Sequence, residues 1–515
     1  MAHVFSGPVE DGVTICRDAA TLSSDHTVLV LLCAIGIGCN LGTEVRGAAA
    51  RLIVTPPSAS VDADQVADFV AVGVSPSGDS TDVAVTWAAA GGTVTDTSTT
   101  GFRHYARFRA GDLTGVYRVI ATAHPGDGKD TALVTVTNGL VGTYYVAPTG
   151  NDANAGTAAA PFKTIQKAAD LVNPGDVVIV EDGIYTDTDG NGSVVAVDRG
   201  GTAGALVTFR ARNKWMAKLD GQNGTAAQGF DLSNGIGYVR IEGFEIYGVA
   251  NVGSPSTGRG SASGIDLYDG GHDSQIVGNH IHDIGRVCTL STNTNGQVAV
   301  YVQVPNVTIE RNLIHDIGRF FPGENGCSYS GFTGYQTLDH GVYLNGGSPG
   351  ADGVMIRNNI FYNTRHGWAV QMYPGSLSNM QVLNNTFAFG NPNKNYTHIV
   401  LDASITGSTI ANNIFYNPEG GRTMEAGGFS GSLTVSNNIT MGSAMTDVGT
   451  PSGMTLVNNR IATNPLLVNP AAADFHPQAG SPAVDGGVTL PQVTVDFDGR
   501  LRPLGAAYDI GAYEN

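Results

Sequence analysis

One asparagine recurs at a fixed place in seven short segments of the second half of the chain. The segments read IVGNHIHDIGR, IERNLIHDIGR, IRNNIFYNTR, VLNNTFAFGN, IANNIFYNPE, VSNNITMGSA and LVNNRIATNP. Aligning their apolar residues places this asparagine at Asn279, Asn312, Asn359, Asn385, Asn413, Asn438 and Asn459, so the intervals are 33, 47, 26, 28, 25 and 21 residues. A short repeat with apolar residues at fixed offsets and no helical period is typical of a solenoid.

The aligned asparagines indicate which kind of solenoid this is. Leucine-rich repeats have a similar length, but they need a leucine-rich consensus that these segments lack. Stacked amides can instead bond the turn backbones of successive coils about 4.8 Å apart. The sequence therefore predicts an all-β fold in which residues 142–515 form a right-handed parallel β-helix.

Residues 51–138 have a different pattern. Short runs such as VADFVAVGV, DVAVTWAAA and GVYRVIATA alternate apolar and polar residues between turn signals. Such runs predict a small β-sandwich. The composition of the whole chain, with 70 glycines and only 14 % charged residues, excludes a coiled coil, a helical bundle and a charge-rich disordered chain. The segment resembles bacterial immunoglobulin-like domains found beside secreted catalytic modules, and the resemblance implies a spacer role.

Residues 1–40 are interpreted as a leader and residues 41–50 as a linker. The apolar run TVLVLLCAIGIGC has 13 residues, fewer than the roughly 20 of a membrane-spanning helix, and it fits the core of an export signal. Its end resembles a bacterial lipoprotein signal, which implies lipidation of Cys39 and membrane anchoring. The preceding segment is acidic, with Arg17 as its one firm cation, so an unlipidated export signal and a buried strand stay open as alternatives.

The charge balance limits the class of partner. The chain has 27 basic and 45 acidic side chains, giving a net charge of −18. A whole-molecule attraction to nucleic acid phosphates is therefore excluded. We expect an exported monomer, extracellular or anchored at the cell surface.

Two intervals in the repeat are longer than the others and mark insertions. They follow the two DIGR motifs and supply residues 287–296 and 320–338, on the same side of the helix. Loops placed in this way wall a groove, and the second is rich in aromatic residues, whose faces suit sugar rings: Phe320, Phe321, Tyr329, Phe332 and Tyr335. The alternative is that these rings only pack the loop on itself.

The two insertions also contain the two cysteines of the predicted mature protein. Cys288 lies in the first insertion and Cys327 in the second, on neighbouring coils. In an exported protein we expect a disulfide between them, with the Cα atoms within about 7 Å.

The strands after each insertion align as GFDLS, GIDLY, AVYVQ, GVYLN and AVQMY. Strand alternation predicts an apolar interior column of Phe230, Ile265, Val300, Val342 and Val370, and a polar outer column of Asp231, Asp266, Tyr301, Tyr343 and Gln371. Carboxylates on adjacent coils repel unless one is protonated or a cation lies between them. Asp231 and Asp266 are therefore candidates for a calcium site or an acid/base pair, with solvated aspartates as the alternative.

The densest set of titratable residues lies next to this column. Asp339-His340 opens one strand, Arg365-His366 opens the next, and His398 is expected in register with His340. We predict catalytic roles for Asp339, His340, Tyr343, Arg365 and His366, and substrate binding by Arg319, Gln371, Tyr373, Trp368, Tyr301 and His398. His282 and His315 are expected to stack on another sheet as solvent-facing repeat residues.

A separate motif has the spacing of a calcium loop. Asp187, Asp189 and Asn191 follow the pattern D-x-D-x-N-G, and Asp198 occupies the twelfth position, where Glu is usual. A structural calcium and an ordinary Asp/Asn/Gly turn are both compatible with these residues.

Both ends of the predicted helix resemble the polysaccharide lyase-like, or pectate lyase-like, group of secreted β-helix proteins. The resemblance rests on YYVAPTGNDANAGTAAAPFKTIQKAADLVNPGDVVIVEDGIY, on SPAVDGG and VDFDGRLRPLGAAYDIGAYE near the C-terminus, and on the paired motifs DHGVYLNGG and RHGWAVQMYP. It implies that FKTIQKAADLV is a short helix capping the core. The fold hosts lyases, hydrolases, epimerases and adhesins, so it does not define the reaction.

The leading hypothesis is a lyase that cleaves a uronate-containing polymer by β-elimination. Elimination needs a cation for the sugar carboxylate, a base for the C5 proton and an acid for the leaving oxygen. Arg319 with Arg365, or calcium, would supply the first. His340 oriented by Asp339 would be the base and Tyr343 the acid.

Two alternatives stay open. A glycoside hydrolase would pair Asp266 with Asp339, or Asp339 with Asp402, since such enzymes need two carboxyl groups about 5 to 9.5 Å apart. A non-catalytic surface protein would use the same face to bind glycans or for adhesion.

Overall fold

The structure is a computed structural model that describes residues 51–62, 65–75, 79–111, 115–124, 128–137, 142–232, 234–250, 262–288, 296–321, 323–327, 338–364, 366–390, 397–418 and 421–515. The predicted leader with Cys39, the linker, Arg365, Tyr329, Phe332 and Tyr335 lie outside these ranges. The chain divides into two compact units between Val136 and Thr137. Within the described ranges, no helix is long and apolar enough to cross a membrane.

The first unit is a β-sandwich of two antiparallel sheets. One has the order β1-β3-β7-β6, with β4 beside β3, and the other has the order β2-β9-β8-β5. Phe69, Phe108, Val119 and Val134 are fully buried between the sheets, as the alternation predicts. The strands are β1 (Arg51–Thr55), β2 (Ser58–Asp62), β3 (Val66–Val74), β4 (Ser80–Thr81), β5 (Ala84–Ala89), β6 (Gly92–Thr100), β7 (Arg103–Ala110), β8 (Gly115–His124) and β9 (Lys129–Thr137). Its likeness to immunoglobulin domains stays a prediction.

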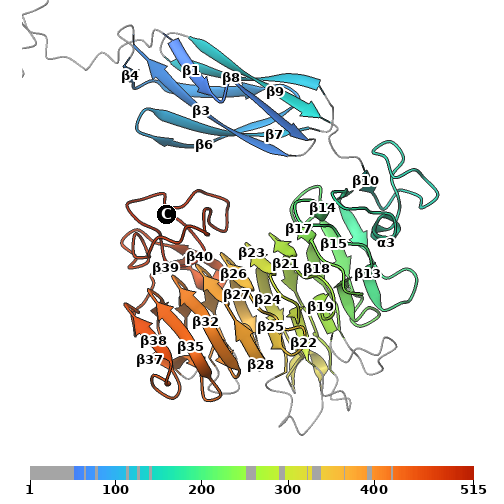
Figure 1. Ribbon diagram of the computed structural model, residues 1–515, viewed down its shortest axis with the longest axis vertical. Coiled ribbons are helices and arrows are strands. Elements are labelled where there is room, and N and C mark those ends of the chain that lie inside the picture. The colour runs from blue at the N-terminus through green and yellow to red at the C-terminus, as the bar shows by residue number, and fades with distance from the viewer. Residues whose placement is uncertain are drawn as a thin grey trace, which may run out of the picture. The chain divides into compact units, whose positions relative to one another are not determined.

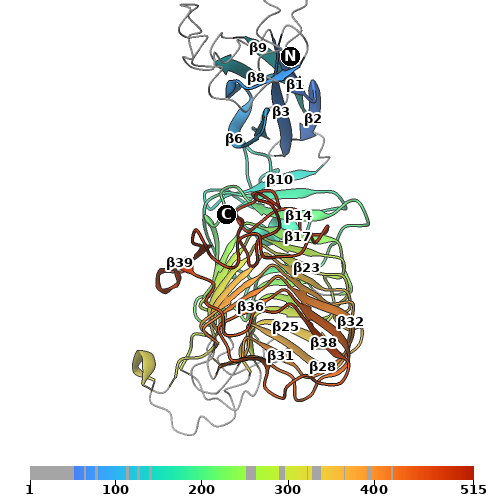
Figure 2. The same ribbon diagram turned by 90° about the vertical axis from the view of Figure 1, so that its left-hand side faces the viewer.

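The second unit is the predicted right-handed parallel β-helix. Figures 1 and 2 show its coils stacked side by side, from green at the N-terminal end to orange at the C-terminal end. The strands of successive coils pair in parallel and form three ladders. The first ladder consists of β13 (Ser193–Val197), β16 (Gln228–Leu232), β19 (Ala262–Leu267), β22 (Gln297–Val302), β25 (His340–Gly346), β28 (Val370–Ser378), β31 (Ile399–Leu401), β34 (Arg422–Glu425) and β37 (Ala444–Thr446).

The other two ladders complete each coil. The second ladder consists of β12 (Gly183–Tyr185), β15 (Ala217–Asp220), β18 (Glu245–Tyr247), β21 (His280–His282), β24 (Leu313–Ile317), β27 (Ile360–Thr364), β30 (Thr386–Ala388), β33 (Ile414–Tyr416) and β36 (Ile439–Thr440). The third ladder consists of β10 (Thr143–Val146), β11 (Val177–Val180), β14 (Val207–Ala211), β17 (Val239–Glu242), β20 (Gln275–Val277), β23 (Thr308–Glu310), β26 (Met355–Arg357), β29 (Gln381–Leu383), β32 (Ser404–Ala411), β35 (Ser430–Ser436) and β38 (Met454–Val457).

The two ends of the helix are covered by short elements. Helix α3 (Ile165–Ala169) begins after Thr164, whose hydroxyl accepts a hydrogen bond from the Lys167 N–H, and it buries Ile165 against the core. The C-terminal residues, including β39 (Leu467–Asn469) and β40 (Asp474–Pro477), follow the last coil. Phe475, Phe497 and Tyr513 from this part pack with outward residues of the second ladder, such as Ile414. The C-terminal segment therefore covers the later coils of that ladder.

A ladder of buried asparagines joins the coils between the second and third ladders. Asn385, which is fully buried, accepts hydrogen bonds from the backbone N–H (2.9 Å) and the side-chain amide (3.0 Å) of Asn359. Its own amide donates to the Ile356 carbonyl at 2.9 Å. The same pattern of a backbone N–H bonded to the next asparagine repeats from Asn279 to Asn459. The predicted register is confirmed.

We expect Asn385→Ala to lower the free energy of unfolding of the β-helix by about 2–4 kcal/mol, because buried donors on Asn359 and the Ile356 carbonyl lose their partner. Denaturant titration followed by circular dichroism measures this change. The control is Asn213→Ala, which removes an exposed amide bonded to Asp182 and should change stability by less than about 0.5 kcal/mol. Equal effects of the two substitutions would show that the ladder is not a main source of stability.

Candidate functional site

The predicted polar column lies on the outer face of the first ladder. Strand pairing places Asp231 beside Asp266, Asp266 beside Tyr301, Tyr301 beside Tyr343 and Tyr343 beside Gln371. The inward residues between them, Phe230, Ile265, Val300, Val342 and Val370, are all fully buried. The alternation read from the sequence is therefore confirmed across five coils.

Stacked aromatic rings form the middle of this column. The rings of Tyr301 and Tyr343 lie 5.1 Å apart in a stacked arrangement, and Tyr268 lies 6.0 Å from Tyr301. The Tyr301 hydroxyl accepts a hydrogen bond from the Asn345 amide at 2.8 Å and lies 3.0 Å from Gln303 Oε1, to which it donates. These contacts fix the ring faces that line the outer surface.

A second outer column runs two residues further along each strand. Tyr268 and Tyr373 are 45 % and 42 % exposed, and Gln303 and Asn345 lie between them in the strand order. The sequence analysis named only Tyr373 among these. The signal for the others was the same two-residue alternation, continued one step beyond the first column.

Tyr343 is held in its protonated form. Burial, with the neighbouring Tyr373 hydroxyl, raises the pKa of Tyr343 to about 12. At neutral pH it is therefore a proton donor, as a general acid must be before the reaction.

Asp231 and Asp266 bring two carboxylates together at one end of the column. They are direct register partners on β16 and β19, and Asp266 is only 4 % exposed. Calcium binds carboxylate oxygens and completes its shell with water or ligand oxygens. The donor chemistry of this pair therefore fits calcium.

Asp339 is the centre of a buried charged network beside the column. Its carboxylate lies 3.1 Å from Arg319 Nη1 and 3.3 Å from His366 Nδ1, and these side chains are 0–2 % exposed. The carboxylate also accepts hydrogen bonds from the backbone N–H groups of Gln297 (3.0 Å) and Arg319 (2.9 Å). The network joins three successive coils at the bases of the insertions.

This burial corrects three of the predicted roles. Burial by itself would raise the pKa of Asp339, but the Arg319 guanidinium and His366 outweigh it and hold that pKa below its usual value. His366 is fully buried, with the Phe321 ring 4.1 Å away in an edge-on contact. Asp339, His366 and Arg319 are therefore buried, and their contacts lie where the insertions begin and end.

His340 was predicted to be an exposed base, but its side chain is only 2 % exposed. Its ring lies 5.6 Å from the ring of Tyr343, a member of the polar column. Its Nδ1 accepts the Trp368 N–H at 3.3 Å, and the two rings stack at 5.7 Å. Burial lowers the pKa of His340 to about 3. Trp368, predicted to bind substrate, is only 6 % exposed and packs against this histidine.

His398 is also interior and not in register with His340. The pairings of Val342 with Val370 and of Val370 with Ile399 place it one residue later. Its ring packs near Phe387 and Phe415, and burial lowers its pKa to about 4. A substrate-binding role for His398 is therefore wrong.

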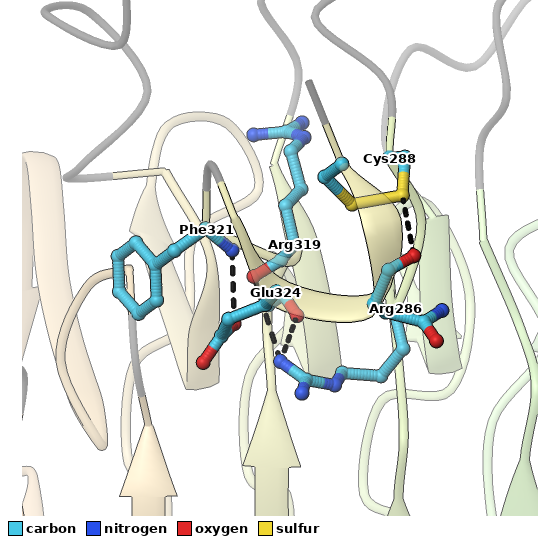
Figure 3. Close-up of a disulfide and its surroundings, with 8 residues drawn as sticks. Arg286, Cys288, Arg319, Phe321 and Glu324 are labelled. Atoms are coloured by element: carbon cyan, nitrogen blue, oxygen red, sulfur yellow. Dashed lines mark hydrogen bonds between the residues drawn. A yellow bond between two sulfur atoms is a disulfide. The ribbon is translucent and has the colours of Figure 1, made fainter. Parts of the chain in front are cut away.

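The predicted disulfide between Cys288 and Cys327 is present, with the Cα atoms 5.2 Å apart. Figure 3 shows the bond next to Arg286, whose guanidinium donates to the Gly318 carbonyl at 3.2 Å. The guanidinium also lies 4.1 Å from the Phe320 ring. The two insertions are thus tied together at their bases, beside the first ladder.

The residues with calcium-loop spacing near residue 190 form a hydrogen-bonded Asp/Asn/Gly turn. The Asp187 carboxylate accepts the N–H groups of Gly190 (2.8 Å) and Gly192 (2.9 Å), and Asp189 accepts the Asn191 N–H at 3.0 Å. Asp198 lies beyond β13 and accepts the Asn234 amide at 2.7 Å. A structural calcium at this turn stays a prediction.

A cleft of about 710 Å³ lies elsewhere, at the carboxyl ends of the second-ladder strands. Its lining includes Asp220, Tyr247, Asp283, Arg286 and Phe320. It is separate from the polar column, because its residues come from the second ladder and from the bases of the insertions.

The comparisons with known proteins agree with a right-handed β-helix in the second unit. Residues 144–305 match the family "Pel9A-like, right handed beta helix region". The chain is 28 % identical over 152 residues to pectate lyase L of Dickeya dadantii, covering 26 % of this chain and 35 % of that protein. It is 35 % identical over 83 residues to pectate lyase PEL9 of Emericella nidulans, covering 16 % and 19 %. The matched segments thus span about a third and a fifth of these relatives.

A solved structure also aligns with this chain. The crystal structure of pectate lyase Pel9A aligns with 73 % of this chain and 98 % of its own chain, at 16 % identity and a TM-score of 0.44. The likeness at this identity concerns the fold alone.

We expect Asp339→Asn to lower the free energy of unfolding by about 3–5 kcal/mol at neutral pH, because the Arg319 charge is left buried without its carboxylate. Chemical denaturation of the variant and the wild type measures the difference. Because the pKa of Asp339 is lowered in the folded state, its carboxylate contributes its whole stabilisation above the ordinary aspartate pKa of about 3.9. It is lost as the pH falls through the lower folded-state pKa.

The matched control for this variant is Glu181→Gln. The Arg212–Glu181 ion pair has a similar distance of 3.0 Å, but its side chains are 18 % and 36 % exposed, so its loss should cost less than about 1 kcal/mol. Comparable losses in both variants would mean that the Asp339 network is no more important than a surface pair.

The buried histidine predicts a pH dependence of stability. The folded-state pKa of His340 is about 3, below the ordinary value near 6.5, so the unfolded chain binds more protons between these values. The folded state therefore loses stability as the pH falls from about 6.5 toward 3. Between pH 7 and pH 4.5, the wild type should lose roughly 2 kcal/mol more than His340→Gln, which removes this titration. Parallel stability curves for the two proteins would contradict the buried neutral histidine.

Proposed function

We propose that the protein is an exported polysaccharide lyase that binds a uronate-containing polymer along the outer face of the first ladder. The observation that carries this proposal is the unbroken polar column from Asp231 to Gln371, with one member on each of five coils. The exposed rings of Tyr268 and Tyr373 flank it, and aromatic faces pack well on sugar rings. The matches to pectate lyases support the same substrate class.

Asp231 and Asp266 are the residues that would hold calcium in this mechanism. A bound calcium ion would neutralise the uronate carboxylate and so favour loss of the neighbouring C5 proton. The two aspartates would hold the ion between them, because they are register partners on adjacent strands.

Tyr343 is the acid that we assign to the leaving group. Its phenolic proton would pass to the glycosidic oxygen as the C4–O bond breaks, and its pKa of about 12 keeps that proton in place beforehand. The C5 proton leaves to a base, and the electron pair forms the C4–C5 double bond. We do not assign that base to His340 or His366, because their side chains are 2 % and 0 % exposed.

The burial of Asp339 disfavours the glycoside hydrolase. Both carboxylate pairs considered for hydrolysis, Asp266 with Asp339 and Asp339 with Asp402, require Asp339 to reach a sugar. Its carboxylate is fully buried and paired with Arg319. The lyase is therefore favoured over hydrolysis by these pairs.

Export is supported by the disulfide. Disulfides persist in oxidising compartments and are rare in the cytosol, so the Cys288–Cys327 bond favours an extracellular location. We retain lipidation at Cys39 and a monomeric state as parts of the proposal.

The test is product formation from acidic polysaccharides, beginning with polygalacturonate, in the presence of calcium. We expect unsaturated products that absorb near 232 nm, and loss of this activity when calcium is chelated. Asp266→Asn should lower the rate by about 10² or more, because one carboxylate of the proposed calcium pair is removed. The control Asp189→Asn, in the exposed turn, should stay within twofold of the wild type.

The other outcomes separate the alternatives. Reducing ends without absorbance near 232 nm would show a hydrolase, and polymer binding without either product would show a non-catalytic glycan-binding protein. Activity that persists in Asp266→Asn and under chelation would exclude the proposed calcium pair.

A further inference from the structure

Three histidines gather on the outer face of the second ladder, away from the polar column. His280 and His282 point outward on β21, on either side of the buried Ile281. His315 on β24 is the register partner of His282. One nitrogen from each of the three histidines can be chosen so that all three atoms lie within 4.8 Å of one another. The repeated sequence HDIGR thus brings imidazoles from adjacent coils to one point.

Two of these histidines are oriented by their own neighbouring aspartates. His282 Nδ1 lies 2.8 Å from Asp283 Oδ2, and His315 Nδ1 lies 2.6 Å from Asp316 Oδ2. Asp283 and Asp316 have φ angles of 51° and 52°, and Asn363 donates to Asp316 at 3.2 Å. A carboxylate on Nδ1 fixes the tautomer in which Nε2 carries the free lone pair, as is usual for metal-binding histidines.

The Nε2 atoms of His280 and His315 lie close together, and the Nε2 atom of His282 lies close to a carboxylate. His280 Nε2 lies 2.7 Å from His315 Nε2, and His282 Nε2 lies 3.2 Å from Glu245 Oε1. Zinc–nitrogen bonds of about 2.0–2.1 Å in a tetrahedron place ligand nitrogens roughly 3.3 Å apart. The observed spacings of 2.7 and 3.2 Å are shorter than this value, and the three histidine nitrogens lie within 4.8 Å of one another, so modest side-chain shifts would complete the geometry.

The surroundings suit a bound ion. Rings of Trp215, Tyr247 and Tyr362 stand 4.9, 5.6 and 4.4 Å from His280, His282 and His315, and the three histidines are half-buried. Tyr247, which stacks on His282, and Asp283, which bonds to His282, also line the cleft described above.

We propose that His280, His282 and His315 bind a divalent transition-metal ion of the zinc class, with Glu245 as the fourth ligand. Imidazole with one carboxylate suits zinc and its neighbours, whereas calcium prefers oxygen ligands alone. The site links three successive coils, because Glu245, His282 and His315 come from consecutive strands of the second ladder. It is independent of the proposed lyase function, which uses the first ladder.

The test is zinc binding to the untagged full chain, freed of metal with a chelator and titrated with zinc chloride in a calorimeter. We expect one zinc per chain, and an affinity at least 100-fold lower in His280→Gln and in His315→Gln. The matched control is His272→Gln, since His272 also bonds to the aspartate that follows it but lies outside the cluster. Asp266→Asn should bind zinc like the wild type, which separates this site from the proposed calcium pair.

Three results would overturn the proposal. These are no stoichiometric binding to the wild type, undiminished binding in the His280→Gln/His315→Gln double variant, or an equal loss in His272→Gln. If a variant fails to fold, modification of the wild type by diethyl pyrocarbonate gives a second measurement. Zinc should protect His280, His282 and His315 but not His272, and equal labelling with and without zinc would reject the site.

Discussion

Stacking of coils at one strand spacing is the constraint on which the rest of this structure depends. Parallel strands must stay in register, and the buried asparagine ladder enforces that register by bonding the turn backbone of each coil to the next. A slip of one residue would turn every side chain of a strand to the opposite face. The polar column on the first ladder and the histidine cluster on the second both exist because no slip occurs.

The sequence predicted the parts of the molecule that follow from periodicity. The asparagine repeat gave the fold, and two-residue alternation gave the outer column from Asp231 to Gln371 and the apolar core beneath it. The insertions predicted the disulfide, because equivalent points on adjacent coils lie close in space. These features depend on spacing alone, which a sequence records directly.

The candidate catalytic residues were harder to predict, because polar side chains also occupy interior positions. The chemistry of His340 suggested an exposed base, but its ring stacks on Trp368 and its side chain is 2 % exposed. Asp339 and His366 sit where the chain enters a strand, and there the loop geometry decides the direction of a side chain. Arg319 is buried only because Asp339 compensates its charge, a pairing across 20 residues that no local pattern reveals.

Because the coils are regularly spaced, the first ladder presents its outward side chains at fixed intervals. Five successive side chains at about 4.8 Å intervals extend over roughly 19 Å. A single sugar can occupy only part of such a strip, so a ligand that engages all of it is an extended chain running across the coils. Gain or loss of one coil would change the length of that strip by one fixed step and leave its chemistry at every other step intact.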